Sequence, residues 1–243
     1  MSLRLHVREA LRSALHRAGF DLVRVLEKDH LLKQAVQVMG ERHIGVVLDV
    51  GANTGQWART IRALGYGGDI ISFEPLSDAY RSLQTEARRD NRWTPINLGL
   101  DEHPGEVVIH VSANSQSSSM LDMLPLHREA APGSVYTRDE TVRTTTLENV
   151  LTEDFPNGGP VFVKVDAQGY EHRVLNGARG VIDRVVALQV ELSLVALYEG
   201  ELLIEDMLAS LRRLGYVPTS FEPNFWSNET GRLLQVDGLF IRS

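Results

Sequence analysis

The sequence predicts an α/β fold built on a doubly wound, mainly parallel sheet. Apolar stretches of strand length alternate with stretches of helical spacing over residues 46–98, and this βαβαβ pattern is typical of such a sheet. The alternation resumes at residues 161–165 and 185–191. Several of these apolar stretches end in a carboxylate, and the first opens into a turn bracketed by glycines. Because parallel strands end at one edge of the sheet, the sequence predicts a ligand site there.

Composition narrows the class of protein. The chain has 243 residues, a net charge of −7, 43% apolar residues and no cysteine. The charge gives no bulk attraction to nucleic acid, and the lack of cysteine removes disulfides, thiolate metal sites and a thiol nucleophile. His103, His110 and His127 lack metal-ligand spacing, so we expect no metal site. No apolar run reaches the ~18 residues of a membrane span and no signal peptide is indicated, so we expect a cytoplasmic protein.

The first 44 residues are predicted to form a helical cap ahead of a main domain at residues 45–243. Residues 3–18 place apolar side chains on one face and carry four arginines against one glutamate. A second helix is predicted from Asp29 to Gly40. The pair would cover the active site, or present a basic surface to anionic membrane lipids, or pack on the sheet as ordinary helices. Assembly as a homodimer is also left open.

The first strand, residues 46–50, runs into a turn from Gly51 to Gly55 and then a helix over residues 55–64. Glycine permits positive φ and a close backbone approach to a ligand, and the helix start offers free N–H groups. A dinucleotide fingerprint would need glycine where Asn53 and Gln56 stand. Those side chains would obstruct a pyrophosphate, which disfavours a nicotinamide oxidoreductase.

S-adenosylmethionine fits this turn better, since it has no phosphate and carries an ammonium and a sulfonium. Asp49 supplies an acid at the first strand end. Glu74 ends the strand at residues 69–73, where a carboxylate accepts both ribose hydroxyls. Asn97, at the end of a third strand over residues 94–98, either contacts the adenine edge or forms a turn.

Residues 99–145 break the alternation. Gly105 turns a predicted hairpin into residues 106–111, and a run rich in Ser, Asn and Gln follows. A long loop over residues 112–140 would either contact a polyhydroxylated acceptor or be a flexible surface loop.

The strand at residues 161–165 is followed by Asp166, which we expect in the same crevice as Asp49 and Gly51, across the topological switch point. The next strand ends in Glu191. Four acids at one rim indicate a site, because an unpaired buried charge is costly. Lys164 is expected to pair with one of these acids.

The tail completes the sheet. A helix is predicted over residues 203–211, and strands at residues 216–221 and 236–241 form an antiparallel pair at the sheet edge. A seven-stranded sheet with a reversed last strand is the class I methyltransferase (Rossmann-like) arrangement.

Over roughly residues 45–242 the chain resembles the FkbM family of S-adenosylmethionine-dependent methyltransferases. The matching stretches are Leu48-Asp49-Val50-Gly51-Ala52-Asn53-Thr54-Gly55, Phe73-Glu74-Pro75, Asn97 with Gly99-Leu100-Asp101, Ser117-Ser118-Ser119, Lys164-Val165-Asp166 with Gln168-Gly169 and Glu171, and Val190-Glu191-Leu192. The resemblance implies S-adenosyl-L-methionine as the cofactor, bound by Asp49, Gly51, Asn53, Thr54, Gly55, Glu74 and Asn97. It also implies that Asp166 lies near the transferred methyl. Ala167-Gln168 departs from the family pattern, in which valine is expected at the first position.

The reaction implied is O-methylation of a hydroxyl on a sugar, a glycolipid or a polyketide-type metabolite. Such a transfer needs aligned reactants and a group that accepts the hydroxyl proton. Asp166 is the first candidate for that base, followed by Glu171, His172 and Glu191. The alternatives are N- or carboxyl methylation, or a non-catalytic module that binds S-adenosylmethionine or a nucleotide. A small-molecule or glycolipid acceptor is the expected partner.

Overall fold

The structure is a computed structural model that describes residues 15, 17, 31–155 and 158–243. The chain divides into two units, residues 1–30 and residues 31–243. The predicted helix at residues 3–18, with the membrane contact assigned to it, lies outside the described residues except for Leu15 and Arg17, which are helical. The description below concerns the second unit.

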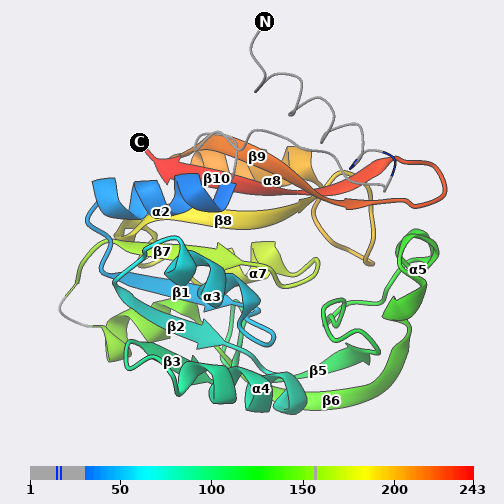
Figure 1. Cartoon of the computed structure of the whole chain (residues 1–243), viewed down its shortest axis with the longest axis horizontal. Coiled ribbons are helices and arrows are strands. Elements are labelled where there is room, and N and C mark those ends of the chain that lie inside the picture. The colour runs from blue at the N-terminus through cyan, green and yellow to red at the C-terminus, as the bar shows by residue number, and fades with distance from the viewer. Residues whose placement is uncertain (1–14, 16, 18–30, 156–157) are drawn as a thin grey trace, which may run out of the picture. The chain divides into compact units, whose positions relative to one another are not determined.

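Within this unit seven strands form one sheet in the order β3-β2-β1-β7-β8-β10-β9 (Figure 1). Its members are β1 (Val46–Val50), β2 (Asp69–Phe73), β3 (Trp93–Ile96), β7 (Val161–Val165), β8 (Val185–Ser193), β9 (Tyr216–Trp226) and β10 (Leu233–Arg242). The first five strands in this order pair in parallel, whereas β10 runs antiparallel to both β8 and β9. The predicted doubly wound sheet with a reversed last strand is confirmed.

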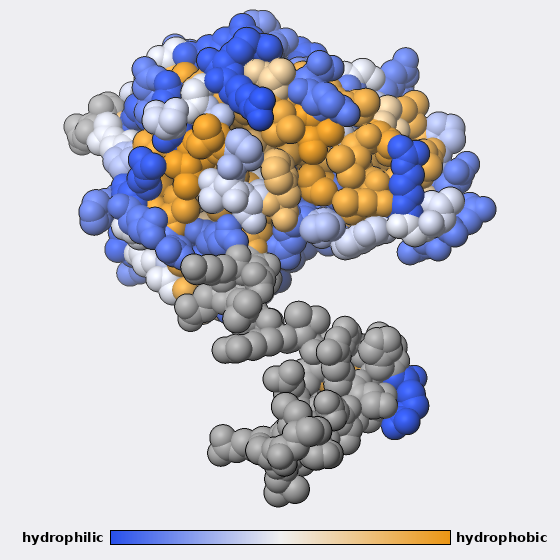
Figure 2. Space-filling model, turned by 90° about the horizontal axis from the view of Figure 1, so that it is seen from above, coloured by the Kyte–Doolittle hydropathy of each residue, from blue (hydrophilic) through white to orange (hydrophobic). Residues whose placement is uncertain are grey.

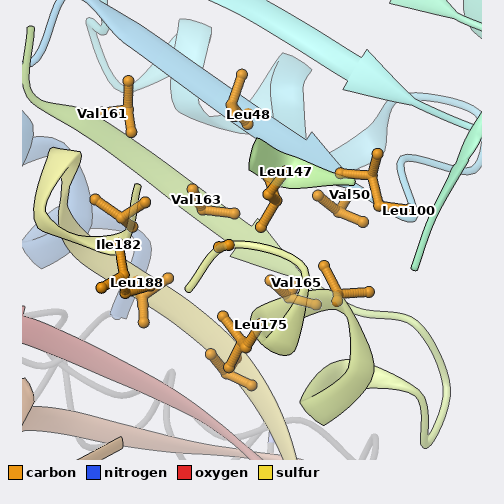
Figure 3. Close-up of a cluster of buried hydrophobic side chains, with 14 of the residues drawn as sticks. Leu48, Val50, Leu100, Leu147, Val161, Val163, Val165, Leu175, Ile182 and Leu188 are labelled. Atoms are coloured by element: carbon orange, nitrogen blue, oxygen red, sulfur yellow. The ribbon is translucent and has the colours of Figure 1, made fainter. Parts of the chain in front are cut away.

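Helices cover both faces of the sheet because each strand alternates its apolar side chains between the two faces. The helices are α2 (Leu31–Glu41), α3 (Gln56–Ala63), α4 (Ser77–Ala87), α6 (Leu147–Asn149), α7 (Glu171–Asn176) and α8 (Ile204–Arg213), with a π-helical turn at Val150–Asp154 and a 3-10 turn at Ile182–Arg184. On one face α2, α3 and α4 enclose a cluster that contains Val47, Phe162 and Leu239. On the other face α6, α7 and α8 pack against Leu48, Val163 and their neighbours (Figure 3).

The helix α2 packs against β8, β9 and β10. It buries Leu31, Ala35, Val38 and Met39 on one side, at the spacing of an amphipathic helix. The backbone N–H of Leu31 donates to Oε2 of Glu222 on β9 at 2.9 Å, which fixes the start of the described helix against the edge strand.

A second, three-stranded sheet replaces much of the stretch predicted to be irregular. It consists of β4 (Gly99–Leu100), β5 (Gly105–Ser112) and β6 (Tyr136–Thr145) in the order β4-β6-β5. A short helix, α5 (Pro125–Ala130), and a 3-10 turn at Pro132–Ser134 also lie within the predicted loop. The predicted loop at residues 112–140 is therefore wrong at its C-terminal end. β6 has no clear apolar pattern in the sequence, because half of its side chains are exposed and many are charged.

β9 forms the edge of the large sheet and carries exposed apolar side chains at Val217, Phe221 and Trp226. This edge is at the top of Figure 1, and the view from above in Figure 2 shows an apolar area bordered by hydrophilic residues. Across residues 31–155 and 158–243, no helix is both long and apolar enough to cross a membrane.

Candidate active site

A cavity of about 390 Å³ opens at the carboxyl ends of the parallel strands. It lies where a doubly wound sheet places its ligands, at the switch point between β1 and β7. Its lining is Val50, Gly51, Ala52, Asn53, Gln56, Trp57, Phe73, Glu74, Pro75, Leu76, Leu98, Gly99, Leu100, Ile109, Ser115, Gln116, Ser118, Ser119, Met120, Lys164, Asp166, Ala167, Gln168, Gln189, Glu191 and Asp237.

The turn after β1 requires glycine at both ends. Gly51 has φ 72°, and a Cβ placed on it would lie 1.9 Å from the carbonyl oxygen of Asp166. Gly55 has φ 85°, and its Cβ would lie 2.6 Å from the ring of Trp93. Asn53, between them, also adopts positive φ, and its side chain oxygen accepts from the N–H of Thr54 at 2.8 Å. The turn thus exposes backbone to the cavity where a side chain would not fit.

Glu74 lies at the end of β2 and lines the same cavity. Its Oε2 accepts from the backbone N–H of Asn53 at 2.8 Å, and its Oε1 accepts from that of Leu76 at 2.8 Å. Burial raises the pKa of this carboxyl to about 7. Each carboxylate oxygen keeps a further lone pair that can accept from a ligand hydroxyl.

Asp49 does not reach the cavity. It is fully buried, and its Oδ2 accepts from the hydroxyl of Ser72 at 3.0 Å. Burial raises the pKa of this carboxyl, against the attraction of Lys164, whose Nζ lies 3.5 Å from Oδ1. Asp49 aligns with Ser72 on β2 and with Lys164 on β7, and Lys164 in turn aligns with Gln189 on β8. These four residues form a polar row across one face of the sheet, in which Lys164 and Gln189 line the cavity and Asp49 and Ser72 do not.

Lys164 joins this row to the cavity. Its buried Nζ lies 3.3 Å from Oδ2 of Asp166 and donates to the carbonyl oxygen of Gly51 at 3.0 Å. Burial alone would lower the pKa of Lys164, but Asp166 and Asp49 outweigh it and the pKa is raised. The predicted pairing of Lys164 with a rim acid is therefore present, with two acids instead of one.

Gln168 connects two acids that sequence analysis placed at the rim. Its Nε2 donates to Oδ1 of Asp166 at 2.8 Å and to Oε2 of Glu191 at 3.0 Å. Its own amide oxygen accepts from the hydroxyl of Tyr198 at 2.7 Å. Glu191 also accepts from the amides of Gln235 and Asn224. Burial, followed by repulsion from nearby acids, raises the pKa of Glu191.

Five other predicted site residues do not line the cavity, namely Thr54 and Gly55 in the glycine turn, and Glu171, His172 and Asn97. Oε1 of Glu171 accepts from the backbone N–H groups of Ala167 and Gly169, so this buried acid, whose pKa burial raises to about 8, holds the loop after β7 in place. His172 is half-buried, and burial lowers its pKa. The amide of Asn97 donates to the carbonyl oxygens of Glu74 and Pro75 and so shapes the end of β2.

Two cavity residues were missed by sequence reasoning. Asp237 is the cross-strand partner of Glu191, and Gln189 accepts from Nε1 of Trp57 at 2.9 Å. Burial raises the pKa of Asp237 to about 6, and nearby Asp166 adds to the shift. Asp237 lies in the first half of a reversed strand, and this is why it reaches the rim formed by the ends of the parallel strands. Only the register of β10 on β8 would have revealed it.

The serine-rich segment at residues 113–121 roofs the cavity. Nδ2 of Asn53 donates to Oγ of Ser115 at 3.2 Å, and Oγ of Ser119 donates to the carbonyl oxygen of Gln168 at 2.6 Å. The roof is thus fastened to both walls, one built by the glycine turn and one built by the loop after β7.

The strand order and the cavity define a protein of the class I methyltransferase type. The family model described as the methyltransferase FkbM domain matches residues 49–218, and the chain belongs to this family. Its cofactor is S-adenosylmethionine. The residues present fit that molecule, because the turn at Gly51 admits no Cβ and Glu74 presents a carboxylate at the end of β2.

Two solved structures are similar to this chain. One is a 1,6-didemethyltoxoflavin-N1-methyltransferase from Burkholderia thailandensis with bound S-adenosylhomocysteine, at 12% identity and a TM-score of 0.43, covering 98% of this chain and 87% of that chain. The other is the magnesium protoporphyrin IX methyltransferase from Synechocystis PCC 6803, at 12% identity and a TM-score of 0.45, covering 100% and 98%. Both scores are below 0.5, so the family assignment rests on the family model. No curated protein matches the sequence.

Proposed function

We propose that the chain transfers a methyl group from S-adenosylmethionine to a hydroxyl oxygen of a sugar, a glycolipid or a polyketide-type metabolite. The observation that carries this proposal is the position of Asp166. Its carboxylate lines the cavity and is 37% exposed, beside the glycine turn on one side and a wall of acids and amides on the other. An accessible carboxylate between a methyl donor and hydrogen-bonding groups suits the removal of a hydroxyl proton.

The cofactor half of the site is assigned to the turn and to the end of β2. Glu74 would accept from the ribose hydroxyls, and Gly51, Asn53, Thr54 and Gly55 would present backbone to the methionine part. When bound, S-adenosylmethionine supplies a methyl group activated by a sulfonium. Asp49 contributes from below, because it holds Ser72 and Lys164 and thus the floor on which Asp166 rests.

The acceptor half is assigned to the carboxylates and amides on β8 and β10. Glu191, Gln189 and Asp237 line this side and offer hydrogen-bond acceptors and donors that match hydroxyl groups. The serines of the roof add further hydroxyls and exclude water, which strengthens the electrostatic interactions beneath them.

The test is a comparison of metabolites between strains. A strain lacking the gene, its parent, and deletion strains that carry either the wild-type gene or Asp166→Asn would be analysed by mass spectrometry of polar lipids, glycans and secondary metabolites. We expect one methyl group to be lost in the deletion strain, restored by the wild-type gene and not restored by the variant. A lost methyl on nitrogen or on a carboxylate would contradict the assignment to a hydroxyl.

Once that acceptor is known, kinetic and binding measurements distinguish two roles for Asp166, proton acceptor or ligand of the methionine ammonium. If Asp166 accepts the hydroxyl proton, Asp166→Asn lowers turnover ~10²–10⁴-fold and leaves the dissociation constant of S-adenosylhomocysteine unchanged. If it holds the methionine ammonium instead, the variant weakens S-adenosylhomocysteine binding and leaves saturated turnover less affected. Asp206→Asn, at an exposed position on α8, is the matched control. Values near wild type for both measurements would remove Asp166 from the mechanism.

A further inference from the structure

The acidic wall of the cavity extends beyond the family's matched stretch. The family model ends at residue 218, whereas Asp237 lies on β10 and lines the same cavity as Asp166 and Glu191. We infer that Asp237 completes a three-carboxylate wall that selects the positively charged methyl donor over the neutral product. Nothing in the family match assigns a role to this residue.

Hydrogen bonds and strand register bring the three carboxylates together. Asp166 and Glu191 share the amide of Gln168, with N–O distances of 2.8 and 3.0 Å. Glu191 and Asp237 are direct cross-strand partners of β8 and β10. The wall therefore runs from the loop after β7, across β8, to the first half of β10.

The wall is short of positive charge. Lys164 lies 3.3 Å from Asp166, but this lysine is shared with Asp49, whose Oδ1 lies 3.5 Å from the same Nζ. Buried Glu171 lies behind the wall and adds a further acid. Glu191 accepts three hydrogen bonds, from the side-chain amides of Gln168, Asn224 and Gln235. These neutral amides orient the carboxylate without cancelling its charge. Burial first, and then the neighbouring acids, raise the pKa values of Glu191 and Asp237.

A cation that enters beside such a wall interacts with charge that the protein has left uncompensated. S-adenosylmethionine brings a sulfonium, whereas S-adenosylhomocysteine has the same adenosine, ammonium and carboxylate with a neutral sulfur. The two ligands thus differ by the one charge that the wall would detect. In a partly buried site this interaction is several times stronger than in water.

Equilibrium binding of three ligands tests the inference without any acceptor. The ligands are S-adenosylmethionine, S-adenosylhomocysteine and sinefungin, which carries a protonated amine in place of the methylated sulfur. In the wild type we expect both cations to bind more tightly than S-adenosylhomocysteine. Asp237→Asn should reduce that preference roughly three- to tenfold by weakening only the two cations. Asp237→Glu should retain the preference, and Asp206→Asn, which removes one exposed charge on α8, should leave it unchanged.

A second measurement uses the wild type alone. Near pH 6 a cation should displace protons from the wall, so calorimetry in buffers of different ionisation enthalpy should show proton release with sinefungin and S-adenosylmethionine and less release with S-adenosylhomocysteine. Equal release by all three ligands would overturn the inference. So would an Asp237→Asn variant that weakens all three equally. Because no acceptor takes part, a failure of the O-methylation proposal would leave these results interpretable.

Discussion

Among the glycines of the described residues, Gly51 leaves the least space for an added Cβ. A Cβ there would lie 1.9 Å from the carbonyl oxygen of Asp166, and the backbone has φ 72°. Both strands that meet at the switch point, β1 and β7, would have to move apart to admit it. The turn is therefore the tightest constraint on the cavity.

We expect Gly51→Ala to lower the free energy of unfolding by at least about 2 kcal/mol and to remove binding of S-adenosylhomocysteine. Gly40→Ala is the matched control, because Gly40 lies in α2 with nothing within 4 Å of an added Cβ. That control should be neutral or stabilising by roughly 0.5–1 kcal/mol. Urea unfolding of both variants measures the contrast, and equal stability would contradict the steric account.

The sequence predicted the positions of some site residues correctly and that of Asp49 incorrectly. Gly51, Glu74, Asp166 and Glu191 were predicted at one rim from the pattern of strands that end in acids, and all four line the cavity. Asp49 was predicted beside them but points into the floor. The difference arises because Asp49 lies within β1, where its carboxylate is held between Ser72 and Lys164, whereas Gly51, Glu74 and Asp166 follow the ends of their strands.

At the scale of elements, the roof is the part that sequence patterning described least well. Its fastening points are Ser115 on Asn53 and Ser119 on the backbone of Gln168, and Tyr136 donates to the carbonyl oxygen of Leu121 at 2.8 Å. None of these contacts is local in sequence, so no short-range pattern could reveal them. The strand β6 was missed for a related reason, since its partner β5 lies across the whole roof.

Limited proteolysis should cut the roof before the rest of the described chain, because few backbone hydrogen bonds hold residues 113–118. We expect S-adenosylhomocysteine to slow this cleavage. Ser119→Ala should speed cleavage at least about fivefold by removing the two hydrogen bonds of this hydroxyl, to the carbonyl oxygen of Gln168 and from the N–H of Leu121. Ser82→Ala, on the exposed face of α4, should not change it. Cleavage that is indifferent both to ligand and to Ser119→Ala would make the segment an ordinary surface loop.

At the scale of the whole molecule, buried acids shape the pH dependence of stability. Burial raises the pKa of Glu74 to about 7 and that of Glu171 to about 8, so the folded chain binds more protons than the unfolded chain above pH 4.5. Stability is then lost as pH rises through these values. His127 and His172 have lowered pKa values and act in the opposite sense, but only below about pH 6.5.

We therefore expect the cofactor-free protein to lose roughly 1–3 kcal/mol of unfolding free energy between pH 6.5 and 8.5. Glu171→Gln keeps an oxygen for the two backbone N–H groups and should flatten the loss, whereas Glu205→Gln, exposed on α8, should not. Urea midpoints at the two pH values provide the measurement. A stability that rises over this range would show that the acids are not the controlling groups.

The large sheet was predictable because its strands combine long apolar runs with helices of clear periodicity. The place of β7 beside β1 followed from the general rules for parallel α/β folds. The family match over residues 49–218 confirms the class that this pattern indicated. The small sheet and the place of Asp237 in the acidic wall were not predictable, because both depend on pairing between segments that carry mixed polar patterns.

The reversed direction of β10 also decides where an added peptide would emerge. β10 begins at Leu233, passes the cavity at Asp237 and leaves the sheet at Arg242, next to the first residue of β9 and the start of β8. Whatever is joined after Ser243, whether an affinity tag or a surface linker, would depart from the opposite rim (Figure 1). Immobilisation through that point would leave the mouth of the cavity facing the solution.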